Sequence, residues 1–160
     1  MKLNVYNWEI LKKHFPDIEF SKKDLQTNLS KKISQYDLDK VQSVDEIDII
    51  NIVFLPPKDI KQLNKDFRKK DTVTDVLSFV LEQNPLIGEI YICPEYIVKE
   101  YDYEEVLRVI VHGFLHLLGY EHTKHFTGKP TSKNDIQEEM FVKQENILQN
   151  IMNEINNRVR

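Results

Sequence analysis

The histidines of this chain are concentrated in residues 112–122, which contain three of the five. His112 and His116 are four positions apart, so in a helix both imidazoles leave the same face, with Cβ atoms about 5–6 Å apart. Gly119 then provides a residue that readily ends a helix in the left-handed conformation, and His122 follows it. A helix, a stop and a returning histidine supply three ligands of a tetrahedron and leave the fourth position open, as catalytic zinc sites require.

This spacing predicts one bound metal ion. Imidazole ligands and tetrahedral geometry favour zinc, while nickel and copper stay open on ligand type alone. The alternative is three unrelated histidines, but residues 109–118 are otherwise apolar apart from Gly113, and imidazoles are costly to bury in such a helix without partners. We interpret His14 and His125 as ordinary histidines outside the site.

The same ligand spacing occurs in the metzincin proteases. Those enzymes carry a glutamate directly after the first histidine, which serves as general base, and this chain has Gly113 at that position. Glu121, beside the third histidine, would approach from a different direction. A peptidase therefore lacks its expected proton acceptor and stands only as an alternative.

The composition is that of one soluble globular domain spanning residues 1–160, with 41% hydrophobic and 30% charged residues. The net charge of −4 does not indicate nucleic-acid binding, so any such binding needs a local basic patch. Cys93 is the only cysteine, which excludes an intramolecular disulfide and suits a reducing compartment. No apolar run has the length of a signal peptide or a membrane span, so we expect a cytoplasmic protein with no membrane partner.

The elements that must position the histidines follow from hydrophobic periodicity and from turn and cap residues. Strands are predicted at 3–6 (an edge strand), 47–55 (an interior strand), 76–81 and 87–92, the last two forming a hairpin around Asn84-Pro85. Helices are predicted at 8–15, from Ser21 to Tyr36, at 57–67, from Pro94, from Glu104 through the histidines, and from Ser132 or Asn134 towards the C-terminus. Asp71 and Asp75 are interpreted as turn and capping residues.

Residues 112–122 resemble the signature of the YbeY family of bacterial ribosomal-RNA maturation endoribonucleases. Residues 63–79 resemble the central block of that family and residues 86–92 the strand after it, while Met140-Phe141 and Gln144-Glu145 match its closing helix. The similarity covers roughly residues 47–150. Two departures are Glu121, where the family usually has aspartate, and a longer loop over about residues 123–134.

The resemblance implies an α+β fold: a small mixed sheet of about four strands, packed with five or six helices, with the metal site on a buried helix. It implies one zinc ion held by His112, His116 and His122, and makes Arg68 the functional arginine of the cleft. The implied activity is endonucleolytic hydrolysis of single-stranded RNA during ribosomal-RNA processing and ribosome biogenesis. The implied partners are a ribosomal-RNA precursor and the small ribosomal subunit or its assembly proteins.

Two alternatives stay open. The first is another zinc-dependent hydrolase, such as a peptidase. The second is a non-catalytic ribosome-assembly factor in which zinc only fastens the last helix to the rest of the domain. The sequence assigns no general base, no cleavage site and no oligomeric state.

Overall fold

The computed structural model describes residues 1–35, 46–120 and 139–159. Its four strands are β1 (Lys2–Tyr6), β2 (Ile47–Phe54), β3 (Val76–Gln83) and β4 (Leu86–Ile92). Its helices are α1 (Trp8–His14), α2 (Lys22–Ser34), α3 (Pro57–Arg68), α4 (Pro94–Val98), α5 (Tyr103–Leu117) and α7 (Glu139–Val159). Seven sequence-based interpretations lie outside the described residues: those of Tyr36, Glu121, His122, His125, Ser132, Asn134 and the loop at about 123–134.

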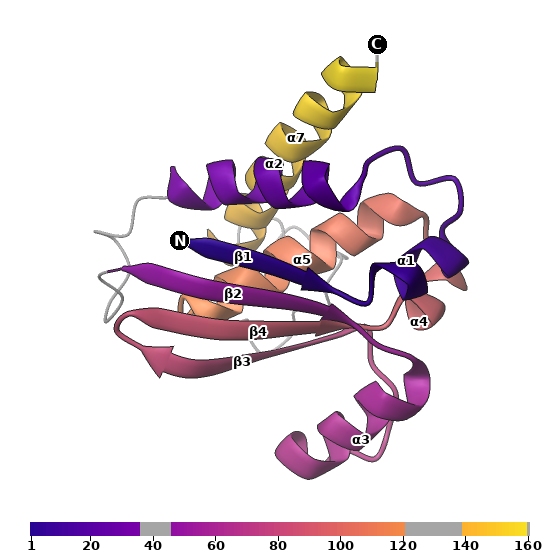
Figure 1. The fold of residues 1–160 in the computed structure, drawn as a ribbon. Coiled ribbons are helices and arrows are strands. Elements are labelled where there is room, and N and C mark those ends of the chain that lie inside the picture. The colour runs from indigo at the N-terminus through magenta and orange to yellow at the C-terminus, as the bar shows by residue number, and fades with distance from the viewer. Residues whose placement is uncertain (36–45, 121–138, 160) are drawn as a thin grey trace.

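The strands form one mixed sheet in the order β1-β2-β4-β3 (Figure 1). β1, β2 and β4 are parallel, and β3 pairs with β4 in antiparallel orientation. The predicted α+β fold is therefore confirmed. β2 lies between two neighbours, as its β-branched composition predicted, while β1 is an edge strand and β3 and β4 form the expected hairpin.

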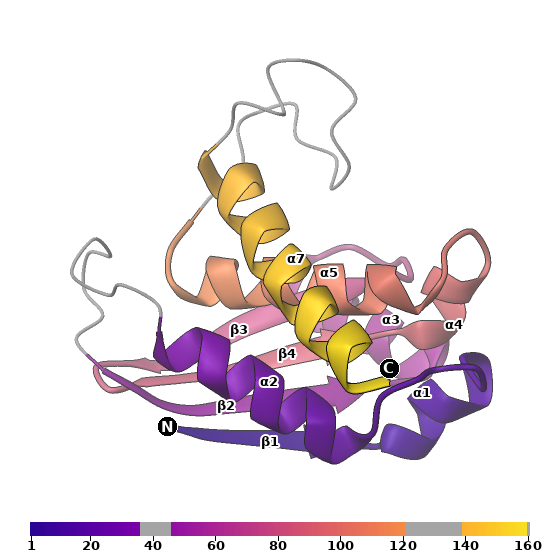
Figure 2. The ribbon, with the colours of Figure 1, turned by 90° about the horizontal axis from the view of Figure 1, so that it is seen from above.

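Helices α2, α5 and α7 lie over one face of the sheet, and α3 lies apart from them beyond the end of β2 (Figures 1 and 2). α5 packs directly on β3 and β4, and α7 packs across α5 and α2. Ten of the fifteen residues of α5 are buried, in keeping with its apolar composition. Within the described residues, no helix combines the length and the apolar character needed to cross a membrane.

Two glycines allow α5 to approach the sheet closely. A Cβ atom on Gly113 would lie 2.9 Å from Cγ2 of Ile90 in β4, and one on Gly88 would lie 2.7 Å from Cδ1 of Leu117. Both distances are shorter than van der Waals contact, so a larger residue at either position would require Ile90 or Leu117 to shift. The histidines of α5 lie on this closely packed helix.

The ends of the helices follow local signals in the sequence. Ser21 and Asp24 form a capping box at the start of α2, as predicted. α5 begins at Tyr103, one residue before the predicted start, because the side chain of Asp102 accepts a hydrogen bond from the backbone N–H of Glu104 at 3.1 Å. Gly119 adopts φ +96°, so the predicted left-handed stop after α5 is confirmed.

Candidate active site

His112 and His116 lie on successive turns of α5, each half-buried. Their ring centroids are 4.6 Å apart with the ring planes at 85°, and the two Nε2 atoms are 3.1 Å apart. The i, i+4 spacing thus brings one nitrogen of each imidazole to the same point.

The opposite nitrogen of each ring is held by a carbonyl oxygen. Nδ1 of His116 donates to the backbone oxygen of Tyr120 at 2.9 Å. Nδ1 of His112 donates to Oε1 of Gln144, in α7, at 2.7 Å. A neutral imidazole carries one N–H, so protons fixed at Nδ1 leave both Nε2 atoms with lone pairs.

Burial lowers the pKa of His112 to about 4, because it disfavours the charged imidazolium. The hydrogen bond to Gln144 opposes this shift, and the neighbouring His116 adds to it. His112 is therefore neutral at pH 7. A neutral imidazole with a lone pair at Nε2 is the form that binds a metal ion.

The two histidines fit a tetrahedral metal. Two nitrogens, each about 2.0–2.1 Å from zinc at the tetrahedral angle, are separated by about 3.3 Å, close to the 3.1 Å between these Nε2 atoms. Two facing lone pairs repel each other, and a cation between them removes that repulsion. A carbonyl oxygen on Nδ1 is also the usual orienting partner of a metal-bound histidine. Across the described ranges, no three His, Cys, Asp or Glu side chains are grouped to hold a metal, and His122 lies outside those ranges.

A cavity of about 560 Å³ lies over the imidazole pair. It brings Arg68, at the end of α3, into the same site as His112 and His116, although Arg68 is far from them in sequence. Arg68 is exposed and forms no ion pair with the described carboxylates. The cavity is also lined by residues of β3, of the segment before it, and of α5 and α7: Thr74, Asp75, Ser78, Phe79, Val80, Glu105, Arg108, Gly113 and Gln144.

Arg68 is positioned by the way α3 ends. Lys69 caps the helix with φ 60°, which turns the chain back towards β3. The side chain of Asn64, buried in α3, donates to the backbone oxygen of Thr72 at 3.0 Å, and the backbone N–H of Lys70 donates to the Asn64 backbone oxygen at 3.2 Å. These bonds fix the segment between α3 and β3, so the arginine leaves a turn of defined shape.

Asp75 was interpreted from the sequence as a turn or capping residue, and it does have a local bonding role. Its Oδ1 accepts from the backbone N–H of Val76 at 2.8 Å and from the Thr74 hydroxyl at 3.3 Å. It also lines the cavity, which the sequence did not indicate. Burial raises the pKa of its carboxyl, and the two hydrogen bonds oppose that rise. Asp75 therefore holds a proton to higher pH than an exposed aspartate does.

A partly buried ion cluster joins α5 to α7 beside the histidines. Nη1 of Arg108 donates to Glu105 at 2.6 Å, and its Nε donates to Glu145 at 3.0 Å. Because Glu145 follows Gln144 in α7, this cluster fixes the amide that faces His112. Sequence reasoning missed both Arg108 and Gln144. Two features of the sequence could have indicated them. Arg108 is a charged residue one helical turn before His112, and Gln144-Glu145 is a polar pair in an otherwise amphipathic helix.

The fold and the cavity together define a class: an α+β protein with paired imidazoles on a buried helix facing an arginine. Comparison with known sequences identifies the family. The chain belongs to the YbeY family, because the family model described as Endoribonuclease YbeY matches residues 12–152.

Curated relatives and one solved structure agree with this assignment. The chain is 35% identical to Endoribonuclease YbeY of Thermotoga neapolitana, over 82% of this chain and 84% of that protein. It is 30% identical to the Persephonella marina protein of the same name, over 89% of this chain and 91% of that protein. The solution structure of TM1509 from Thermotoga maritima matches with a TM-score of 0.53 and 26% identity, covering 98% of this chain and 93% of that one. The family predicted from the sequence is confirmed.

Proposed function

We propose that this protein is a zinc-dependent endoribonuclease that cleaves single-stranded RNA during ribosomal-RNA processing in the cytoplasm. Its curated relatives carry the name endoribonuclease, which supports a nuclease acting on RNA. The observation that carries the proposal is the 3.1 Å pair of Nε2 atoms in one cavity with Arg68. His112 and His116 would hold the zinc, with His122 as the third ligand.

The side chains around the cavity have distinct tasks in this proposal. Bound zinc supplies a Lewis acid that lowers the pKa of a coordinated water and polarises a phosphoryl oxygen. Arg68 binds the phosphate through its two-pronged guanidinium and stabilises the charge that builds there during cleavage. Asp75, whose pKa is raised by burial, is a carboxyl of the cavity wall that can accept or donate a proton during cleavage.

The position of Gly113 argues against a peptidase. A metzincin would carry its catalytic glutamate there, but even a Cβ atom at this position would lie 2.9 Å from Ile90. Gly113 lines the cavity, but a side chain at this position would first have to displace Ile90 from its present packing. An exposed arginine in the cavity that forms no ion pair with the described carboxylates can bind phosphate, which favours a nucleic-acid substrate instead.

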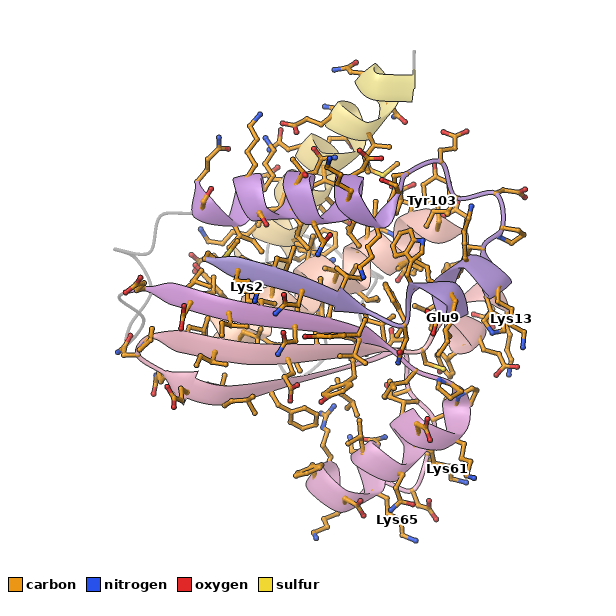
Figure 3. All side chains as sticks on the ribbon, in the orientation of Figure 1. Lys2, Glu9, Lys13, Lys61, Lys65 and Tyr103 are labelled. Carbon is orange, nitrogen blue, oxygen red and sulfur yellow. The ribbon has the colours of Figure 1, made fainter. Side chains whose placement is uncertain are left out.

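The test is cleavage of single-stranded RNA by protein of known zinc content, with Arg68→Ala compared with Lys65→Ala. Lys65 is an exposed cation on the same helix, and Figure 3 shows it projecting away from the sheet. Arg68→Ala is expected to lower kcat/KM by about 100-fold or more, as removal of a transition-state donor does, while Lys65→Ala stays near wild type.

Two results would contradict the proposal. Full activity of the Arg68 variant would remove this arginine from the mechanism. If nuclease-free, zinc-loaded protein never cleaves RNA, the assembly-factor alternative is preferred. Circular dichroism of both variants shows whether a loss of activity reflects a loss of the fold.

A further inference from the structure

An exposed aromatic side chain lies beside the cavity. Phe67 is 67% exposed, the largest exposed fraction among the large hydrophobic residues of the described chain. It directly precedes Arg68 at the end of α3. Its ring centroid is 5.3 Å from that of Phe79, which lines the cavity from β3. Phe67 thus lies between solvent and the wall of the candidate active site.

Phe67 is the outer member of a row of three rings. Phe79 lies 5.9 Å from Tyr91 in β4, so the row runs from α3 across β3 to β4. Phe79 and Tyr91 are half-buried and pack against a small core of Ile60, Leu77 and Cys93. The two inner rings therefore give Phe67 a rigid backing, while its own outer surface meets water.

A single exposed apolar residue is ordinary on a protein surface. The surroundings of Phe67 are what make it informative. Arg68, Lys69 and Lys70 follow it directly, and all three are exposed, in a chain whose net charge is −4. An aromatic face next to a cluster of cations is the arrangement by which proteins bind single-stranded nucleic acid: the bases stack on the ring and the phosphates pair with the cations.

The charged groups near the three rings differ between the two ends of the row. Burial, and secondly the carboxylate of Glu89, raise the pKa of Tyr91 to about 12. A phosphate is therefore favoured at the Arg68 end of the row and repelled at the Tyr91 end. Only the Phe67 end offers an uncovered ring close to a cation.

We propose that Phe67, backed by Phe79, is the stacking platform for an unpaired nucleobase next to the phosphate bound by Arg68. The inference rests on the proposed function insofar as RNA is the substrate. A base inside a duplex is already stacked on its neighbours and cannot lie on this ring. The platform thus gives the site a physical reason to prefer single strands.

The test compares Phe67→Leu, which keeps an apolar side chain but removes the ring, with Phe67→Tyr, which restores a ring. Tyr96→Leu is the matched control, because Tyr96 is another exposed aromatic residue, 46% exposed, and lies on α4 outside the cavity. The probe is a short single-stranded 2′-O-methyl RNA containing one 2-aminopurine, whose fluorescence is quenched on stacking. Its integrity is checked on a denaturing gel after each titration.

Phe67→Leu is expected to weaken binding about 5- to 100-fold, the range for loss of one stacked base, and to abolish the quenching. Phe67→Tyr and Tyr96→Leu are expected to bind and quench like wild type, and a double-stranded probe is expected to show no difference among the variants. Wild-type affinity and quenching in Phe67→Leu, or no binding of the single strand by wild type, would overturn the platform.

Binding and cleavage are separate measurements, so the two proposals can fail independently. If wild type binds the probe through Phe67 but never cleaves RNA, the platform stands and the nuclease proposal fails. If wild type cleaves RNA while Phe67→Leu binds the probe as tightly as wild type does, the nuclease proposal stands and the platform is wrong.

Discussion

The hydrogen bond between His112 and Gln144 should control metal affinity. The bond is short, 2.7 Å, and Gln144 is fully buried, so no water can replace it as the acceptor. We consider Gln144→Leu, which removes the acceptor and nearly preserves the side-chain volume. Nε2 of Gln144 has no hydrogen-bond partner among the described residues, so its loss breaks no other bond.

The magnitude follows from the tautomers of His112. Without Oε1 of Gln144, the imidazole can move its proton to Nε2 and donate it to Nε2 of His116, 3.1 Å away. Zinc binding must then return the proton to Nδ1, where it has no acceptor. An unsatisfied buried donor costs about 1–3 kcal/mol, which corresponds to a zinc affinity lower by about 5- to 150-fold. In other metal sites, mutation of the residue that orients a histidine ligand typically lowers metal affinity by about 10- to 100-fold.

The assay is competition for zinc with a chromophoric chelator. Gln144→Glu is expected to retain tight binding, because a carboxylate can only accept the Nδ1 proton. Gln149→Leu is the control: Gln149 is exposed on the same helix, and its side chain donates to Oδ1 of Asn153 at 3.0 Å, the one side-chain bond it makes within the described ranges. A Gln144→Leu protein that is folded and binds zinc as tightly as wild type would refute the reasoning.

Three further predictions concern other parts of the site. Asp75→Asn should stabilise the protein at neutral pH, because burial raises the pKa of the Asp75 carboxyl in the folded state. The contribution of protonated Asp75 to the free energy of unfolding is fully present below the unfolded-state pKa of about 3.9, and it is lost as the pH rises through the folded-state pKa. The free energy of unfolding of both proteins is measured with urea across this pH range. A difference between them that stays the same at every pH would contradict the prediction. Gly113→Ala should lower the free energy of unfolding by about 1–3 kcal/mol through overpacking against Ile90, which outweighs the gain in helix propensity of about 1 kcal/mol. Unchanged thermal unfolding would disprove the close packing. Added zinc should raise Tm in wild type but not in His116→Ala, and an equal rise in both would place the metal elsewhere.

Most of the fold was predictable because its signals are local. The β-branched run from Ile47 identified the central strand, and Pro57 identified the start of α3, since proline is favoured at the first helical position. Ser21 identified the cap of α2, and Gly119 identified the end of the histidine helix. Each of these features is decided by residues within one or two turns of the chain.

The partners of the histidines were not predictable, because they depend on contacts distant in sequence. Gln144 meets His112 across 32 positions, and Glu145 meets Arg108 across 37. Hydrophobic periodicity predicts that α7 packs on the domain, but not its rotation or its register against α5, which decide which polar side chains face the site. The local bonds of Asp75 agree with its interpretation as a turn or capping residue, whereas its place in the cavity wall depends on where α5 lies.

The depth of α5 links the fold to the proton chemistry of the site. Gly113 and Gly88 allow the helix to lie so close to β4 that a Cβ atom at the position after His112 would meet Ile90, and the glycine found there supplies no base. A proton carrier must therefore come from another wall of the cavity. Asp75, directly before β3, is a titratable carboxyl on such a wall, and burial has already raised its pKa. Asp75→Asn is therefore expected to slow RNA cleavage and flatten its pH profile without changing zinc affinity. A weaker zinc affinity would instead make Asp75 a support of the metal site.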